Sequence, residues 1–99
     1  MLLSLGYTAA ANRDCKNIIR RCSDEMRPRM MRAIRELDYE LKVDGHLKGS
    51  PAPGNSSMRR LADEENLLAV VYLTRRALMD RYIEVRHFIP LVTLETGEV

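Results

Sequence analysis

The sequence predicts an all-α protein, a long antiparallel helical hairpin that dimerises into a four-helix arrangement. Two segments with apolar residues at helical spacing predict it, together with the loop rich in Pro, Gly and Ser that separates them. The chain has 99 residues, which is enough for one domain, and this single helical domain is expected to span 1–99. Helices of this length in one hairpin would leave apolar surface on their outer sides, so a homodimer is expected.

The first helix is expected from about residue 8 to residue 42. Thr8 can cap it, because its hydroxyl can accept from the free amides of the first turn. Apolar residues then recur every three or four positions, namely Cys15, Ile19, Cys22, Met26, Met30, Ala33, Leu37 and Leu41. Pro28 interrupts this segment, so either one helix kinks there or two helices meet, with Ser23 or Asp24 capping the second. The apolar phase continues across Pro28 without a slip, which favours the kinked but continuous helix.

A loop over 43–57, a second helix over 57–86 and a C-terminal arm over 87–99 complete the predicted domain. The second helix has acidic residues in its early turns and arginines later, as the helix macrodipole favours. Arg75 falls inside its apolar arc, so we expect a carboxylate partner across an interface, or a role in binding if the surface is open. The arm is β-prone but contains Pro90, and it either packs on another element or pairs weakly.

The net charge of the chain is only +2, from sixteen basic and fourteen acidic residues, which does not by itself imply a polyanion partner. The basic residues are Arg except for Lys16, Lys42 and Lys48. The guanidinium group is always charged and matches the geometry of phosphate and carboxylate. A compositional preference for Arg over Lys is the alternative explanation.

Cys15 and Cys22 lie two turns apart on the predicted helix, too far for a disulfide within it. Small buried side chains are the expected role of both, with a disulfide between subunits as the alternative. The two histidines are distant in sequence, so neither a metal site nor any other cofactor is expected. The apolar start of the chain is too short to span a membrane, so a soluble, cytoplasmic protein is expected, without a membrane partner.

One face of the first helix gathers basic residues opposite the apolar stripe. It comprises Arg13, Lys16, Arg20, Arg21, Arg27, Arg32, Arg35 and Lys42. Arg59 and Arg60 form a second basic group at the start of the second helix, where phosphate could meet free amides. A basic rod can follow the phosphates of a duplex without reading its bases. The alternative is a solvated face with local ion pairs such as Asp38 with Lys42.

This combination of small size, helical hairpin, basic helix and ragged tail resembles the B2 proteins of nodaviruses over residues 8 to 86. The resemblance implies a viral protein that binds double-stranded RNA as a four-helix dimer and suppresses RNA silencing. It is one of architecture and carries over no individual residue beyond the basic face. Sequence-independent binding of double-stranded RNA, by the basic residues of the first helix with Arg59 and Arg60, is therefore the leading functional hypothesis.

Catalytic motifs are absent from the sequence, since it has no glycine-rich phosphate loop, no H-E-x-x-H and no G-x-S-x-G. The chain is therefore expected not to be an enzyme. The alternative to RNA binding is a small protein-interaction module, such as a phage or bacterial regulator that docks an apolar helix face on a host protein. The two hypotheses differ in salt dependence, because phosphate binding weakens steeply with salt and apolar docking does not.

Overall fold

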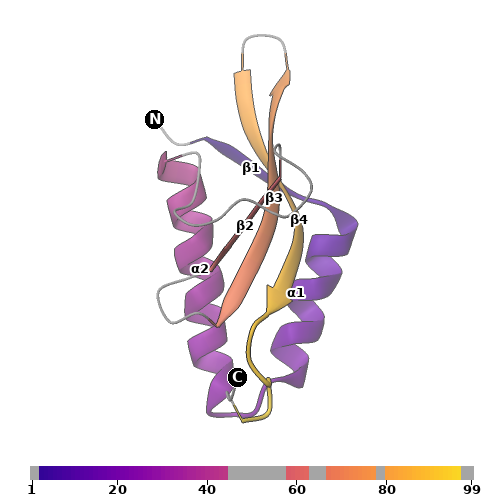
Figure 1. The fold of residues 1–99 in the computed structure, drawn as a ribbon, viewed down its shortest axis with the longest axis vertical. Coiled ribbons are helices and arrows are strands. Elements are labelled where there is room, and N and C mark those ends of the chain that lie inside the picture. The colour runs from indigo at the N-terminus through magenta and orange to yellow at the C-terminus, as the bar shows by residue number, and fades with distance from the viewer. Residues whose placement is uncertain (1–2, 45–57, 63–66, 78–79, 97–99) are drawn as a thin grey trace.

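The protein has a mixed α/β fold in the computed structural model, which describes residues 3–44, 58–62, 67–77 and 80–96 (Figure 1). The elements in chain order are β1 (Ser4–Tyr7), α1 (Ala9–Arg21), α2 (Met26–Asp44), β2 (Met58–Ala62), β3 (Leu68–Ala77) and β4 (Asp80–Pro90). The prediction of an all-α hairpin is therefore wrong, and with it the four-helix arrangement built from such hairpins.

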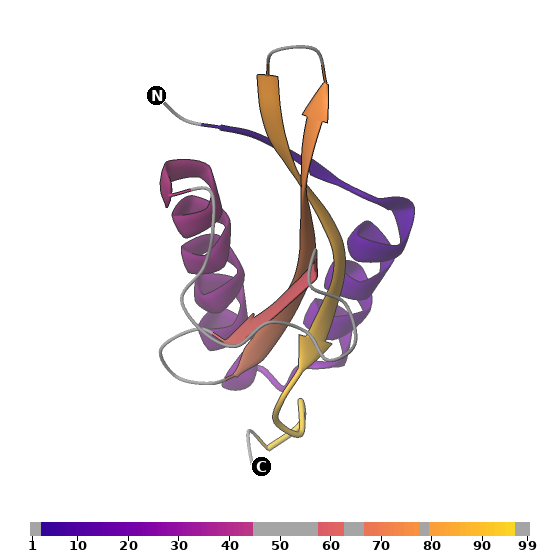
Figure 2. The same cartoon turned by 45° about the horizontal axis from the view of Figure 1, so that its top comes forward.

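The strands form one four-stranded sheet in the order β1-β4-β3-β2. Strand β1 runs parallel to β4, while β2 and β4 each run antiparallel to β3. Helix α1 packs mainly along β4, and α2 contacts both β1 and β3. Figure 2 shows the end of the β3–β4 hairpin extending past both helices. The sheet thus joins the two ends of the sequence, because β1 precedes both helices and β4 follows them.

The helical half is two helices, so the prediction of one kinked rod over residues 8–42 is wrong. Thr8 caps α1 as expected, with its hydroxyl accepting from the amide of Ala11 at 3.1 Å. Ser23 then starts α2, because its hydroxyl accepts from the amide of Met26 at 3.1 Å. Pro28 lies in the first turn of α2, where its missing N–H would have no intrahelical acceptor. Proline therefore follows a break in the helix instead of kinking a continuous one.

One hydrophobic core lies between the helices and the sheet. The apolar stripe predicted for the first segment contributes to it, since Cys22, Met26, Met30, Ala33, Leu37 and Leu41 are buried and Cys15 and Ile19 are partly buried. The sheet supplies Leu68, Val70, Tyr72, Ile83, Val85 and Phe88. The spacing of apolar residues therefore predicts the buried face of the helices correctly. That face packs on a sheet, however, and not on a second long helix as expected.

The second predicted helix, over 57–86, is replaced by strands β2, β3 and β4. Residues 70–74 and 82–85 are mostly β-branched or aromatic, which favours extended backbone. Burial alternates along β4, where Ile83 and Val85 lie in the core and Glu84 between them does not. A β-bulge then skips Arg86 in the pairing with β3, which shifts this alternation. Because of this shift, the apolar residues of β4 do not keep the two-residue period that indicates a strand.

The C-terminal arm over 87–99 begins inside β4 and ends against the helices. Leu94 is buried in the core, and its carbonyl accepts from the amide of Ser23 at 3.1 Å. The arm therefore packs on another element, the junction between α1 and α2. Most of the predicted loop over 43–57 lies outside the described residues, as do residues 97–99.

Among the residues that the structure describes, no helix is both long enough and apolar enough to cross a membrane.

Candidate functional site

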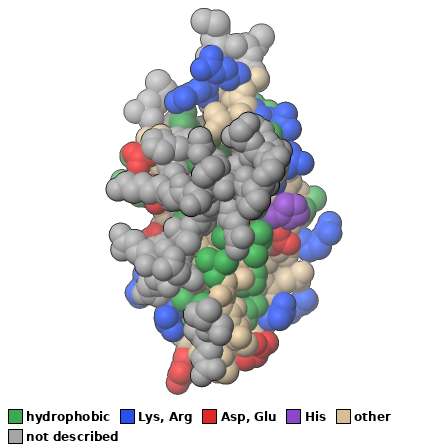
Figure 3. Space-filling model, viewed as in Figure 1, with side chains coloured by type: hydrophobic (Ala, Val, Ile, Leu, Met, Phe, Trp, Pro, Cys, Tyr) green, Lys and Arg blue, Asp and Glu red, His purple; other side chains and the backbone are tan. Residues whose placement is uncertain are grey.

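Four arginines gather on the β3–β4 hairpin and form what we call the arginine cluster: Arg75, Arg76, Arg81 and Arg86. Strand pairing sets Arg76 directly opposite Arg81 on one face of the hairpin, whereas Arg75, opposite Tyr82, lies on the other face with Glu84. Arg75, Arg76 and Arg81 are exposed, and Arg86 is half-buried. Figure 3 shows basic side chains at the end of the molecule where this hairpin lies.

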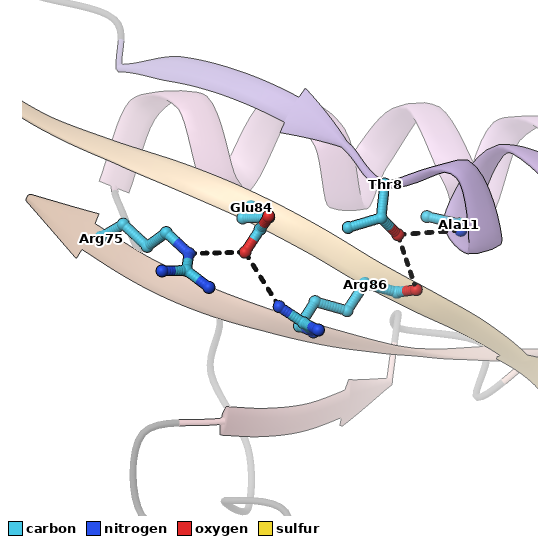
Figure 4. A network of polar contacts seen from close by, with 5 residues as sticks. All are labelled: Thr8, Ala11, Arg75, Glu84 and Arg86. Carbon is cyan, nitrogen blue, oxygen red and sulfur yellow. Dashed lines mark hydrogen bonds and ion pairs between the residues drawn. The ribbon is translucent and has the colours of Figure 1, made fainter. Parts of the chain in front are cut away.

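Glu84 holds two members of the arginine cluster in place (Figure 4). Its Oε2 accepts from Nε of Arg75 at 2.6 Å and from Nη1 of Arg86 at 3.0 Å. The hydrogen bond from Arg75 lowers the pKa of Glu84, and the same bond raises the pKa of the Arg75 guanidinium. Arg75 is exposed and Glu84 is partly exposed, so the ion pairs orient the arginines more than they stabilise the fold.

The β-bulge connects this network to the start of α1. The carbonyl of Arg86, the bulged residue, accepts from the hydroxyl of Thr8 at 3.1 Å, and the carbonyl of Val85 accepts from the amide of Thr8 at 3.0 Å. The same hydroxyl caps α1 through Ala11, as Figure 4 shows. The backbone that carries Arg86 is therefore fixed to a helix terminus.

The arginine cluster is suited to binding carboxylate groups. Two of its guanidinium groups, those of Arg75 and Arg86, hold Glu84, the one acidic residue of β3 and β4 whose side chain the structure describes. No ion pair within the described residues involves Arg76 or Arg81. Planar guanidinium groups form paired, charge-assisted hydrogen bonds with carboxylates. The end of the hairpin thus presents an excess of directed positive charge beyond the helices.

The basic residues predicted from the first helix do not form one rod. Arg13, Lys16, Arg20 and Arg21 are exposed on α1, whereas Arg32 and Arg35 are exposed on α2. The two helices are separate elements that flank the sheet (Figure 1). The continuous basic surface on which the RNA hypothesis rested is therefore absent.

Arg27, another predicted phosphate ligand, is engaged within the chain. Its guanidinium donates to the carbonyls of Ile19 at 3.2 Å and Cys22 at 2.9 Å, and it pairs with Asp24 at 2.9 Å. These carbonyls belong to the last turn of α1, where intrahelical donors are lacking. Arg27 is thus a C-terminal cap of α1 supplied by α2.

Arg59 and Arg60 lie in strand β2 and not at the start of a helix, so the proposed contact with free helix amides is wrong. Their backbones pair with Tyr72 and Val71 of β3. Their side chains are outside the described part of the structure.

The prediction that Arg75 needs a carboxylate is confirmed in part. The carboxylate belongs to Glu84 of the same chain, and Arg75 is exposed instead of buried in an interface. Sequence reasoning missed Arg76, Arg81 and Arg86, because it treated them as cations at a helix C-terminus. A usable signal was present, since Arg76 and Arg81 are placed symmetrically about residues 78 and 79, as in a tight hairpin.

A second polar contact joins α1 to β4. One carboxylate oxygen of Asp14 accepts from the amide of Phe88 at 3.2 Å and lies 3.1 Å from Nδ1 of His87. Within the described ranges, no group of three or more His, Cys, Asp or Glu side chains is placed to hold a metal ion. The Asp14 carboxylate therefore has a structural role, because it satisfies a backbone amide where β4 passes α1.

The fold and its exposed arginine cluster define a small α/β domain with a candidate surface for protein binding. No family model matches the sequence. No curated protein matches it either. One solved structure, described as "Chromosomal ParDE TA system from P. aeruginosa", is similar in fold, with a TM-score of 0.65 and 16% sequence identity. The similarity covers 90% of this chain and 96% of that chain, and at this identity it shows a shared fold.

This comparison overturns the resemblance to nodavirus B2 proteins. The chain shares its mixed α/β fold with a toxin–antitoxin protein and has no four-helix architecture. The viral assignment and the suppression of RNA silencing depended on that architecture, and binding of double-stranded RNA depended on the continuous rod. All three are wrong.

Proposed function

We propose that this chain is one member of a bacterial toxin–antitoxin pair and acts by binding the other protein of the pair. The observation that carries the proposal is the likeness to a ParDE chain over nearly the whole length of both proteins. A match of this extent includes the helices and the sheet together, not a single common motif. Binding instead of catalysis, and a cytoplasmic location, are parts of this proposal.

The arginine cluster indicates the chemistry of the partner. Charged groups at an interface set which partner is accepted and how fast it associates. Four arginines on the two strands, with Glu84 as the one carboxylate of β3 and β4 whose side chain the structure describes, favour a partner segment rich in Asp and Glu. We therefore expect the partner to place an acidic segment along the end of the β3–β4 hairpin.

The experiment is co-expression of this chain with the product of the neighbouring reading frame in its genome. One affinity tag is placed on this chain, and bacterial growth is followed with each protein alone and with both together. The proposal expects the two proteins to co-purify, one of them to arrest growth, and the other to relieve the arrest. Failure to form a complex, together with unaffected growth in every combination, would contradict it.

A further inference from the structure

Helix α2 carries an exposed row of side chains that the fold leaves unpartnered. Met31, Arg35, Tyr39 and Val43 are spaced four residues apart, and we call them the α2 ridge. The exposed fractions are 42% for Met31, 69% for Tyr39 and 43% for Val43. Rows with this spacing are the ridges by which helices pack on one another.

The α2 ridge is unusual within this protein. Ile89, at 37% exposed, is the only other large hydrophobic residue that is exposed in the described part of the chain. Single exposed apolar side chains are ordinary, but three in one row are a candidate contact. The opposite side of α2 is buried against the sheet, so the ridge faces away from the core.

The charges of α2 are arranged against the helix macrodipole. Residues 26–35 include four arginines and no acidic residue, whereas residues 36–44 include four acidic residues and one lysine. A helix favours negative charge at its start and positive charge at its end, so this order costs stability in an isolated helix. An antiparallel helix with the same order places its acidic half beside this basic half and offsets the cost.

The α2 ridge is also symmetric under such an arrangement. A twofold axis that crosses the ridge midway between Arg35 and Tyr39 sets Met31 of one copy beside Val43 of the other. The same axis sets Arg35 of each copy beside Tyr39 of the other, which gives two equivalent pairs. Each end of the contact is then apolar, and each central pair joins a guanidinium to an aromatic ring, which is a favourable combination.

We propose that the α2 ridge binds a second copy of this chain, with the two α2 helices antiparallel. The contact uses α2, whereas the arginine cluster lies on β3 and β4, so the homodimer does not depend on the toxin–antitoxin assignment. One helix face buries less than the roughly 800 Å² per partner of a standard interface. The dimer is therefore expected to form reversibly as concentration rises.

Sedimentation of the purified full-length chain over a wide range of concentration tests the homodimer. The wild type should pass from monomer to dimer, and Tyr39→Glu should weaken association about thirtyfold, as expected of a central interface tyrosine. Ile89→Glu is the control, because it adds the same charge at another exposed apolar position, outside the ridge. Circular dichroism checks that both variants keep the fold.

Disulfide trapping tests the antiparallel geometry. Met31→Cys and Val43→Cys variants are prepared with Cys15→Ser, which removes the native thiol that is partly exposed. Mixing the two should yield cross-linked dimers of unlike variants faster than either variant alone forms dimers. Equal rates in the mixture and the separate samples would overturn the antiparallel arrangement.

Two results would overturn the proposal as a whole. One is a chain that stays monomeric at every concentration. The other is a dimer that Tyr39→Glu leaves as strong as the wild type. If Tyr39→Glu instead blocks only capture of the neighbouring gene product, the ridge belongs to that partner and the homodimer is likewise overturned, while the proposed function stands.

Discussion

Arginine serves different purposes at the α1–α2 junction and on the β3–β4 hairpin. At the junction, Arg27 directs its guanidinium at two backbone carbonyls and at Asp24, so its hydrogen-bonding capacity is used within the fold. On the hairpin, Arg75 and Arg86 share one carboxylate, while Arg76 and Arg81 face each other across the strands. Arg27 is therefore structural because its donors are used within the fold, whereas Arg76 and Arg81, with no ion pair among the described residues, remain available to a partner.

The largest expected effect tests whether both regions depend on the same core. Ile83 in β4 and Leu37 in α2 are both buried in it. Replacing either by Ala should lower the free energy of unfolding by about 3 kcal/mol, because each change leaves a cavity. Urea unfolding measures this, with the exposed Ile89→Ala as control. A large loss of stability for one variant and almost none for the other would show that the two regions do not share one core.

Arg27→Ala should give the next largest loss, because it leaves two carbonyls at the end of α1 without their donor. Hydrogen bonds from a charged group predict a loss of about 2 kcal/mol in the free energy of unfolding. Arg27→Lys should recover only part of this, since an ammonium cannot reproduce the fork of a guanidinium. Arg20→Ala on the exposed surface of α1 is the control, and equal losses for Arg20 and Arg27 would refute the structural role.

Thr8→Ala should cost about 1 kcal/mol, the usual cost of losing a helix N-cap. The change removes the acceptor for the amide of Ala11 and the donor to the carbonyl of Arg86. Thr8→Ser keeps the hydroxyl and should stay within a few tenths of a kcal/mol of the wild type. Unfolding by urea distinguishes the two variants, and identical stability of Ala and Ser at this position would argue against the cap.

The smallest expected effect concerns the pH dependence of the Glu84 network. The pKa of Glu84 in the folded protein is lowered from the usual 4.5, chiefly by the hydrogen bond from Arg75. The group therefore contributes stability above its unfolded pKa and loses that contribution as pH falls through the folded pKa. Glu84→Gln should show a slightly smaller decrease in stability on acidification than the wild type, measured by unfolding midpoints. A larger decrease for the variant would contradict the assigned direction.

Local signals in the helical half could be predicted from the sequence. The Thr8 cap, the buried stripe and the ion pair of Asp38 with Lys42, at 3.4 Å, depend on neighbours within about one turn. The sequence leaves a break before Pro28 open as the alternative, but the apolar phase that continues from Cys22 to Met26 favours a continuous helix. The spacing of apolar residues alone therefore does not distinguish one kinked helix from two helices.

The strands could not be predicted in the same way. Leu67 to Val70 are all buried, so this stretch has no alternation of burial to distinguish a strand from a buried helix. No Gly or Pro lies between residues 58 and 89 to mark the turns, and the bulge at Arg86 changes the phase within β4. The arginine cluster depends on the register of β3 with β4, which a one-residue slip would destroy. The symmetric placement of Arg76 and Arg81 about residues 78 and 79 could have indicated that pair, but the contacts of Arg75 and Arg86 with Glu84 depend on a register that spacing does not give.

The most direct test of the central claim is the affinity of this chain for the neighbouring gene product, measured by titration calorimetry at low and high salt. The double variant Arg76→Glu with Arg81→Glu is compared with Arg13→Glu with Arg20→Glu, which makes the same charge change on α1. The account predicts that the hairpin variant binds at least about tenfold more weakly at low salt and that the α1 variant binds like the wild type. Equal affinities for the two variants, or binding that does not respond to salt, would contradict it.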